Sequence, residues 1–176
     1  MTVSDPINLS DFIRDVPDFP KPGILFKDIT PLLASPEAFR ATIDALAERF
    51  EGEAIDVIAA AEARGFFFGP SLAQRLGVGF VPIRKPGKLP YHKIGIEYAL
   101  EYGNDRLEIH SDAFAGGRRV LLLDDVLATG GTMAACRDLV RQAGAEVVAF
   151  AFVIELAFLE GRAKLMPGEV FSVLTY

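Results

Sequence analysis

The segment with the clearest chemical content is residues 120–132, which read VLLLDDVLATGGT. Its apolar start predicts a buried strand, and two carboxylates, Asp124 and Asp125, stand where that strand ends. A glycine-rich turn at 128–132 then leads into a predicted helix. Backbone N–H groups converge in such a turn, and the helix N-terminus adds partial positive charge, so the turn is suited to bind a phosphate.

The two acids indicate which phosphate compound this turn would bind. A carboxylate repels an adjacent phosphate, but it accepts hydrogen bonds from vicinal hydroxyls a sugar's length away, and a phosphate flanked by a diol is a ribose 5-phosphate. The alternative is an ordinary turn that the glycines merely permit. Two adjacent acids at the end of an apolar strand argue against it, because one of them must point toward the covered side of the sheet. Other phosphate-binding motifs do not fit, since no GxGxxG follows a strand and no complete P-loop is present.

Composition limits the remaining classes of protein. The 176 residues fit one domain, and the net charge of −6 argues against a surface that tracks nucleic-acid phosphates. The single cysteine, Cys136, cannot form an internal disulfide, and neither His92 nor His110 stands near it at metal-ligand spacing. The N-terminus lacks the pattern of a signal peptide, and no apolar stretch reaches the roughly 18 residues of a membrane span. We therefore expect a cytoplasmic protein that binds neither nucleic acid nor membranes.

The elements that must position these residues alternate along the chain. Apolar runs predict buried strands at 55–61, 78–83, 119–123, 147–154 and 170–174. Helical spacing and capping residues predict helices over 8–15, from Ser35-Pro36 to before Gly52, over 69–76, and over 132–143. Strands that are apolar on both faces and alternate with helices predict an α/β fold with a mainly parallel sheet covered on both sides. Ligands of such sheets bind beyond the carboxyl ends of the strands.

Residues 84–105, RKPGKLPYHKIGIEYALEYGND, have neither a single helical nor a single strand pattern. Basic residues, tyrosines and glycines are mixed in this stretch. We interpret it as a long functional loop, a mobile lid with edge strands.

The segment LLLDDVLATGGT resembles the phosphoribosyl pyrophosphate signature of type I phosphoribosyltransferases. Four further blocks are similar to the adenine-specific members of that family, and they cover most of the chain in the same order: PDFPKPGILFKDITPLL at 17–33, ARGFFFGPSLAQRLG at 63–77, IRKPGKLP at 83–90 and ALEYG at 99–103. The resemblance implies one domain over residues 1–176 with the type I phosphoribosyltransferase fold. That fold has an open, mainly parallel sheet flanked by helices, a small N-terminal hood at about 17–33, and a mobile lid at about 84–105.

The resemblance also assigns the donor-binding residues. It places the ribose-hydroxyl acids at Asp124 and Asp125, and the 5′-phosphate loop at Ala128, Thr129, Gly130, Gly131 and Thr132. Arg64 matches the pyrophosphate-loop arginine, and an arginine at a strand end can bind phosphate oxygens in a bidentate way. The alternative for Arg64 is a solvated side chain paired with Glu62.

The remaining site residues lie in the hood and the lid. Leu25, Phe26 and Lys27 match the hood that holds the base, with Phe26 stacking on it; the alternative is that Phe26 is ordinary core. Arg84 and Lys85 match a basic cluster that attracts pyrophosphate. The family residue that matches Arg84 reaches the neighbouring subunit, which implies a homodimer. Glu101 and Tyr102 match lid residues that approach the base and the reacting centre; the alternative for Glu101 is a surface glutamate.

The implied reaction joins adenine to phosphoribosyl pyrophosphate and yields AMP and pyrophosphate, with Arg64 and Glu101 as catalytic residues. Mg²⁺ is expected to arrive on the pyrophosphate, because no dedicated protein cage for the metal is visible. Two other functions stay open. The base could be xanthine, guanine or hypoxanthine, or the chain could be a non-catalytic regulator that senses phosphoribosyl pyrophosphate. Such a regulator should carry an added nucleic-acid-binding element and a basic face.

Overall fold

The computed structural model describes residues 7–99 and 104–176. Its centre is a five-stranded sheet in the order β4-β3-β7-β8-β9, in which all four neighbouring pairs are parallel. The strands are β3 (Val57–Ala61), β4 (Gly79–Ile83), β7 (Arg119–Leu127), β8 (Glu146–Glu155) and β9 (Glu169–Thr175). The predicted parallel α/β sheet is confirmed, and each predicted strand overlaps one of these five.

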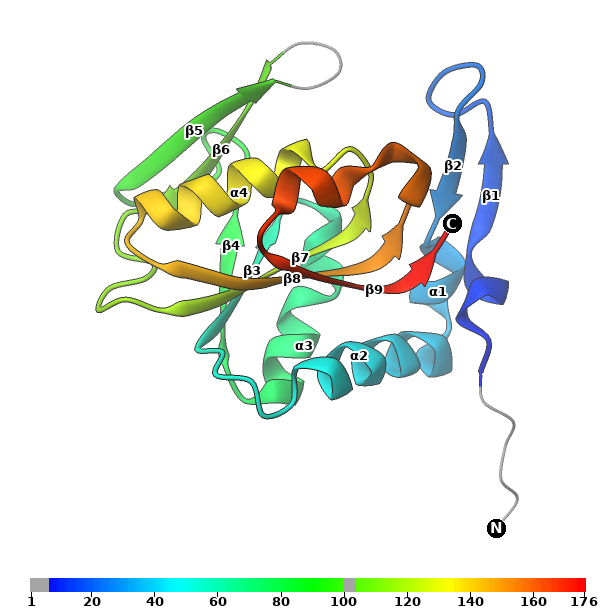
Figure 1. The fold of residues 1–176 in the computed structure, drawn as a ribbon, viewed down its shortest axis with the longest axis horizontal. Coiled ribbons are helices and arrows are strands. Elements are labelled where there is room, and N and C mark those ends of the chain that lie inside the picture. Colours follow the sequence, from blue (N-terminus) through cyan, green and yellow to red (C-terminus); the bar gives the residue numbers. More distant parts are fainter. Residues whose placement is uncertain (1–6, 100–103) are drawn as a thin grey trace.

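Helices cover both faces of the sheet (Figure 1). They are α1 (Thr30–Ala34), α2 (Pro36–Phe50), α3 (Gly69–Leu76) and α4 (Gly131–Gln142). Leu121 and Leu123 of β7 join the core formed with α2 and α3, whereas Leu122 joins the core formed with α4. This alternation along β7 explains why its sequence is apolar at successive positions. The Oγ of Ser35 accepts a hydrogen bond from the backbone N–H of Ala38 at 3.2 Å, so the predicted N-cap of α2 is confirmed.

The prediction of a helix over 8–15 is wrong beyond its first turn. A 3₁₀ helix spans Leu9–Phe12, and the chain then forms β1 (Arg14–Pro17), which pairs antiparallel with β2 (Leu25–Asp28). Proline at position 17 disfavours helical angles at the residue before it, and one short turn is too small to be stable alone. Pairing with β2 therefore decides the conformation.

The stretch 84–105 is more regular than its sequence suggested. β5 (Lys93–Ala99) and β6 (Asn104–His110) form an antiparallel hairpin. This hairpin is a sheet of its own and not an edge of the central sheet, and its second strand continues beyond residue 105. The alternation in KIGIEY places Ile94, Ile96 and Tyr98 against the core on the α4 side of the sheet. Residues 100–103 lie outside the described part of the chain.

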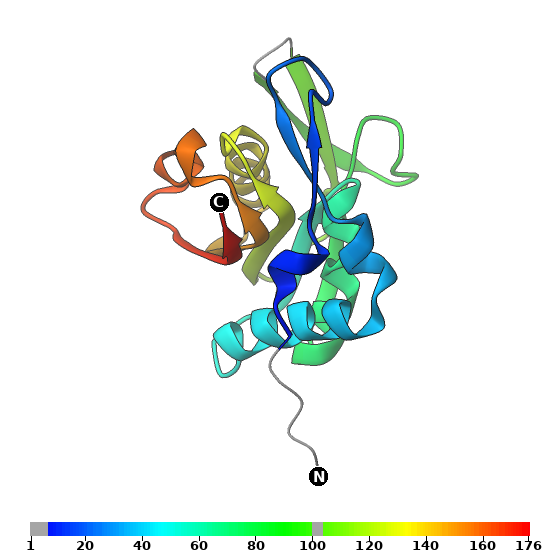
Figure 2. The same ribbon diagram turned by 90° about the vertical axis from the view of Figure 1, so that its right-hand side faces the viewer.

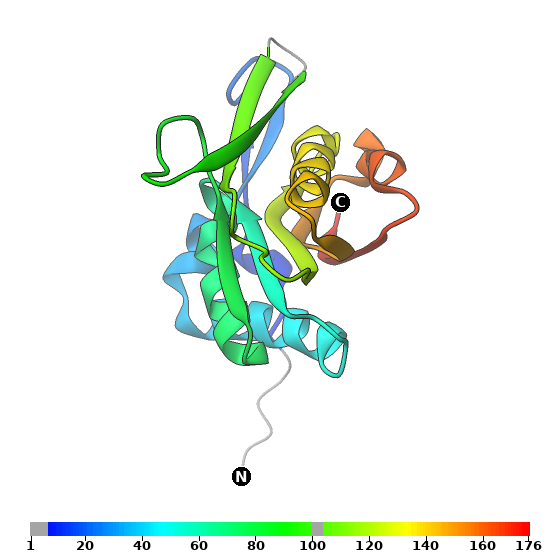
Figure 3. The same cartoon turned by 90° about the vertical axis from the view of Figure 1, so that its left-hand side faces the viewer.

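Both hairpins project toward the same side of the molecule, and β5 lies along α4 (Figure 1). The carboxyl ends of β7, β8 and β9 point toward the β1–β2 hairpin in that view, and the loop between β4 and β5 extends outward in Figure 3. Across residues 7–99 and 104–176, no helix combines the length and apolarity that crossing a bilayer requires.

Candidate active site

The predicted strand end before the two acids is wrong, because β7 continues to Leu127, so Asp124 and Asp125 lie within its last four residues. The two acids have different surroundings. The carboxylate of Asp125 is almost completely buried, and its Oδ2 lies 2.9 Å from the Nε of Arg64. Asp124 lines a cavity, and its Oδ1 accepts a hydrogen bond from the backbone N–H of Asp125 at 2.9 Å. The expectation that one of the two acids points into the covered interior is therefore confirmed.

Burial makes this pair of charges costly in the free protein. Burial raises the pKa of Asp124 well above its usual range, and the adjacent Asp125 raises it further. Burial also raises the pKa of Asp125, although the guanidinium of Arg64 opposes that shift. Two partly desolvated carboxylates are suited to a ligand that donates hydrogen bonds, such as a pair of sugar hydroxyls.

The glycine-rich turn after β7 forms a small cavity at the N-terminus of α4. The cavity has a volume of about 180 Å³. Its lining is Arg64, Asp124, Val126, Ala128, Thr129, Gly130, Gly131, Thr132 and Met133. Gly130 precedes the helix with φ of 77° and offers no side-chain cap to the first N–H groups of α4. Those N–H groups and the helix dipole are the elements that bind a phosphate in such turns.

Arg64 stands between the acids and the β1–β2 hairpin. It begins the 3₁₀ helix Arg64–Phe67, which two residues separate from the end of β3, and its guanidinium carbon lies 5.5 Å from the ring centre of Phe26. Its side chain is 45% exposed, so donors remain accessible to a ligand. The alternative, in which Arg64 pairs with Glu62, is wrong. Arg64 pairs with Asp125, and Glu62 accepts a hydrogen bond from Arg84 Nε at 3.1 Å.

Gly65 is a site residue that the sequence did not single out. A Cβ at this position would lie 3.1 Å from the carbonyl oxygen of Leu123 and 3.2 Å from Oδ1 of Asp124. Glycine therefore lets the 3₁₀ helix approach the end of β7 closely enough for Arg64 to reach Asp125. The block ARGFFFG, which contains Gly65, does not by itself show that this backbone lies close to β7, because that contact depends on the position of β7 in the sheet.

The β1–β2 hairpin presents an apolar surface near Arg64. Phe26 is only partly buried and packs edge-on against Phe19 with ring centres 5.1 Å apart, so it is not ordinary core. Leu25 is 48% exposed. The Nζ of Lys27 lies 2.6 Å from Asp15 Oδ1 and 3.9 Å from the ring centre of Tyr176, so this side chain holds the hairpin together.

The basic residues after β4 are paired within the chain. Besides Glu62, Arg84 contacts the carbonyl oxygen of Lys88 through Nη1 at 3.4 Å. Lys85 forms an ion pair with Asp105 of β6, and the hydroxyl of Tyr98 donates to the same carboxylate at 3.1 Å. Tyr98 was not anticipated, although the alternation of β5 points it inward.

The structure thus brings together most of the predicted site. The residues that converge at the carboxyl ends of the strands are Phe26, Arg64, Asp124, Asp125 and the turn 128–132. Arg84 and Lys85 follow the end of β4 directly. Glu101 and Tyr102 fall outside the described residues, and their roles stay predictions.

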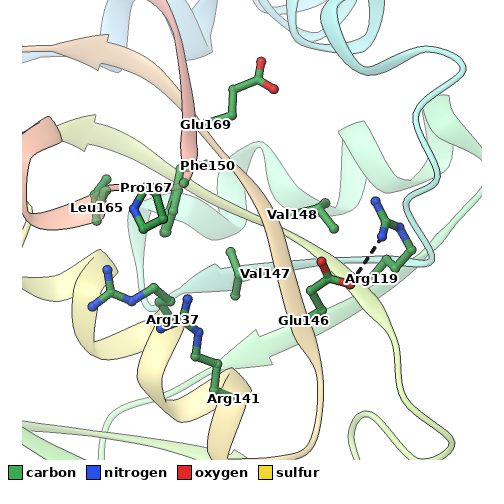
Figure 4. A pocket seen from close by; sticks show the side chains of 11 residues that line it. Arg119, Arg137, Arg141, Glu146, Val147, Val148, Phe150, Leu165, Pro167 and Glu169 are labelled. Atoms are coloured by element: carbon green, nitrogen blue, oxygen red, sulfur yellow. Dashed lines mark hydrogen bonds and ion pairs between the residues drawn. The ribbon is translucent and has the colours of Figure 1, made fainter.

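A second, larger cavity of about 370 Å³ lies at the other end of the sheet, between the C-terminal half of α4 and the first residues of β8 and β9 (Figure 4). Three arginines line it, but all three have acidic partners: Arg119 Nη1 lies 3.3 Å from Glu146 Oε2, and Asp138 Oδ1 lies 3.0 Å from Arg137 Nε and 4.0 Å from Arg141 Nη1. It is also remote from the carboxyl ends of the strands, where parallel sheets bind ligands.

Comparisons with known proteins agree with this geometry. Residues 28–168 match the phosphoribosyl transferase domain. The chain is 61% identical over 168 residues to the adenine phosphoribosyltransferase of Maridesulfovibrio salexigens, covering 96% of this chain and 99% of that protein. The adenine phosphoribosyltransferase of Thermoanaerobacter pseudethanolicus superimposes with a TM-score of 0.93 at 54% identity, covering 96% and 98% of the two chains.

A second similar structure contains ligands. The Saccharomyces cerevisiae adenine phosphoribosyltransferase, complexed with D-2,5-dideoxy-2,5-imino-altritol 1,6-bisphosphate and adenine, has a TM-score of 0.88 at 45% identity. The alignment covers 94% of this chain and 96% of that one. By sequence and by structure, the chain belongs to the adenine phosphoribosyltransferase family of type I phosphoribosyltransferases.

Proposed function

We infer that this enzyme transfers the phosphoribosyl group of phosphoribosyl pyrophosphate to adenine, giving AMP and pyrophosphate. The observation that carries this inference is the convergence of the phosphate-sized cavity at 128–132 with Asp124, Asp125 and Arg64. A 5′-phosphate in the turn places the ribose over the acids and the pyrophosphate toward the arginine. Phe26 then faces the side from which a base would approach.

The residues have separate tasks in the proposed reaction. The bond between the anomeric carbon and the pyrophosphate oxygen breaks, and its electron pair leaves with pyrophosphate. Arg64 stabilises that charge, while N9 of adenine forms the new bond to the anomeric carbon and gives up its proton. We propose Glu101 as the group that accepts this proton and Tyr102 as its neighbour in the lid. Holding the sugar, the leaving group and the base in line supplies much of the rate enhancement.

Mg²⁺ belongs to the donor in this proposal. The two carboxylates nearest the cavity are already engaged, one with Arg64 and one with a backbone N–H group, so they do not form a preorganised metal cage. Mg²⁺ commonly binds through substrate phosphates and few protein ligands. We propose that it enters as the magnesium complex of the donor and neutralises part of the pyrophosphate charge.

The base-binding surface is proposed to be the β1–β2 hairpin. Phe26 offers a stacking face, and the backbone groups of Leu25 and Lys27 can read the purine edge. Adenine carries a 6-amino donor where guanine, hypoxanthine and xanthine carry a carbonyl acceptor. A site built for one leaves a buried polar group unpaired against the other, which can discriminate by about 10⁴-fold.

Base-by-base measurement of pyrophosphate release, with donor and Mg²⁺ fixed, tests the proposed activity. We expect turnover with adenine and little with hypoxanthine, guanine or xanthine. An oxopurine that matched adenine in kcat/KM would contradict the choice of base. Donor binding without turnover of any purine would favour a sensing regulator instead.

We further propose that the enzyme is a homodimer in which the basic segment at 84–88 completes the partner's site. The ion pairs of Arg84 with Glu62 and of Lys85 with Asp105 hold the start of this segment at the end of β4. Sedimentation at assay concentrations should show a dimer. A fully active monomer would contradict this part of the proposal.

A further inference from the structure

Glu155 is a buried carboxylate that the proposed chemistry does not use. It ends β8 and pairs in the sheet with Leu127, the last residue of β7 before the phosphate-binding turn. Only 5% of the residue is exposed. A carboxylate this deeply buried is tolerated only when its oxygens are paired.

Arg162 pairs with both oxygens of Glu155. Its Nε and Nη2 lie 2.6 Å from Oε1 and Oε2, and the hydroxyl of Ser172 donates to Oε2 at 2.8 Å. The hydrogen bonds from Arg162 lower the pKa of Glu155 below its usual range, so the carboxylate stays charged. The third nitrogen of the guanidinium, Nη1, donates to the carbonyl oxygen of Val170 at 2.7 Å. Arg162 is thus fixed to β8 and β9 in one orientation.

The residue before Arg162 touches the phosphate-binding turn. A Cβ on Gly161 would overlap the carbonyl oxygen of Ala128, and a Cβ on Gly130 would lie 2.5 Å from the carbonyl oxygen of Gly161. The two backbones are therefore in contact, with no room for a side chain on either glycine. Figures 2 and 3 show this segment, coloured orange, beside the start of α4.

The turn before Gly161 contains a residue in an unfavourable backbone conformation. Glu160 has a φ of 53°, a left-handed conformation that residues with a side chain seldom adopt. The 3₁₀ helix Gly161–Leu165 follows, and Arg137 of α4 donates to the carbonyl oxygen of Lys164 at 2.9 Å. Contacts on both sides of the turn therefore compensate for its backbone conformation.

We propose that Glu155 and Arg162 are positioning residues for the 5′-phosphate of the donor. Their bidentate pair fixes Gly161 against Ala128 and Gly130, and this backbone contact sets the shape of the phosphate-binding turn. The proposal rests on the proposed function for its ligand, a ribose 5-phosphate group. It predicts that a charge pair outside the site controls donor binding and leaves adenine binding nearly unchanged.

Glu155→Gln tests the proposal with a small change of shape. The amide can still accept from Ser172, and Arg162, whose side chain is 48% exposed, is left partly in solvent and not as a buried charge. We expect the dissociation constant of ribose 5-phosphate, measured by calorimetry, to rise roughly tenfold, because displacements of about 1 Å cost up to ~100-fold at such sites. The KM for the donor should rise similarly, and the KM for adenine by less than about twofold.

Two further variants separate positioning from general stability. Arg162→Lys keeps the charge but loses the planar fork of the guanidinium. The affinity of this variant for ribose 5-phosphate should therefore lie between the affinities of Glu155→Gln and the unmodified protein. Glu146→Gln is the matched control, because Glu146 is also a β8 carboxylate paired with an arginine, Arg119, at 3.3 Å, but at the opposite end of the sheet. It should bind ribose 5-phosphate normally.

The outcomes distinguish this proposal from the proposed function. A lower melting temperature with unchanged ribose 5-phosphate binding in Glu155→Gln and Arg162→Lys would overturn it, and so would equal losses for donor and adenine. Because ribose 5-phosphate binding needs no turnover, the positioning role can be confirmed even if adenine proves not to be the base. If the unmodified protein failed to bind ribose 5-phosphate, both the positioning role of Glu155 and Arg162 and the proposed function would be overturned.

Discussion

Replacing Asp124 by asparagine should change stability and donor binding in opposite directions. The carboxylate lines the cavity, burial and Asp125 raise its pKa, and Arg64 is paired with the other acid. An isosteric amide removes one of two adjacent buried charges. We therefore expect the fold to become more stable by about 1 kcal/mol at neutral pH, which corresponds to roughly 2–4 °C in Tm for a chain of this size.

The same substitution should weaken donor binding. Hydrogen bonds to a charged acceptor contribute about 1–2 kcal/mol more than those to a neutral one, so affinity for the magnesium complex of the donor should fall roughly 5- to 30-fold. Calorimetric titration with the donor and thermal unfolding of the same samples measure both effects. A variant with unchanged donor affinity, or with a lower Tm at neutral pH, would refute the reasoning.

The pH dependence of stability gives a further check on this variant. A carboxyl group whose pKa is higher in the folded state than in the unfolded state favours folding when it is protonated. Its contribution is complete below the ordinary pKa of aspartic acid and is lost as the pH rises through the raised value. The stability advantage of Asp124→Asn should therefore grow with pH from acid to neutral solution. A constant difference across that range would show that Asp124 titrates normally.

Three other substitutions test separate parts of the site. Arg64→Lys keeps the charge but loses the bidentate fork, and we expect pyrophosphate release to fall roughly tenfold or more in kcat/KM for the donor; an unchanged value would remove Arg64 from the mechanism. Gly130→Ala meets the carbonyl oxygen of Gly161 and a φ of 77°, so it should lose about 1–3 kcal/mol in unfolding free energy together with ribose 5-phosphate affinity; normal affinity would show that the turn is not the phosphate site. Lys27→Met removes the ion pair with Asp15 and the cation above the ring of Tyr176, and both contacts hold the β1–β2 hairpin. The KM for adenine should therefore rise severalfold, while the affinity for ribose 5-phosphate stays the same. Loss of both would contradict a role limited to the base.

The sheet could be predicted because its strands are buried on both faces. β3 is wholly apolar, β7 is apolar from Val120 to Leu123, and such runs between helices allow few other folds. The glycine-rich turn at 128–132 was predictable for a similar reason, since acids and glycines after an apolar run are uncommon unless a ligand or a tight turn requires them. The resemblance then supplied the order of the remaining blocks.

Features that depend on distant segments could not be predicted in the same way. The pairing of β1 with β2 overrode a short helical pattern. Glu62, the alternative partner considered for Arg64, pairs instead with Arg84, which follows the next strand, β4. The contact between Gly130 and Gly161 joins residues 31 positions apart, and neither glycine's local sequence indicates it. Glu155 and Arg162 form a recognisable pair only when β8, β9 and the intervening turn are folded together.

A crystal structure with AMP bound would test the central claim most directly. We predict the 5′-phosphate within hydrogen-bond distance of the backbone N–H groups of 129–132, the ribose hydroxyls on Asp124 and Asp125, and the purine against Phe26. AMP bound in the cavity lined by Arg119 and Arg137, or bound with its phosphate away from the turn at 128–132, would contradict the assignment of the site.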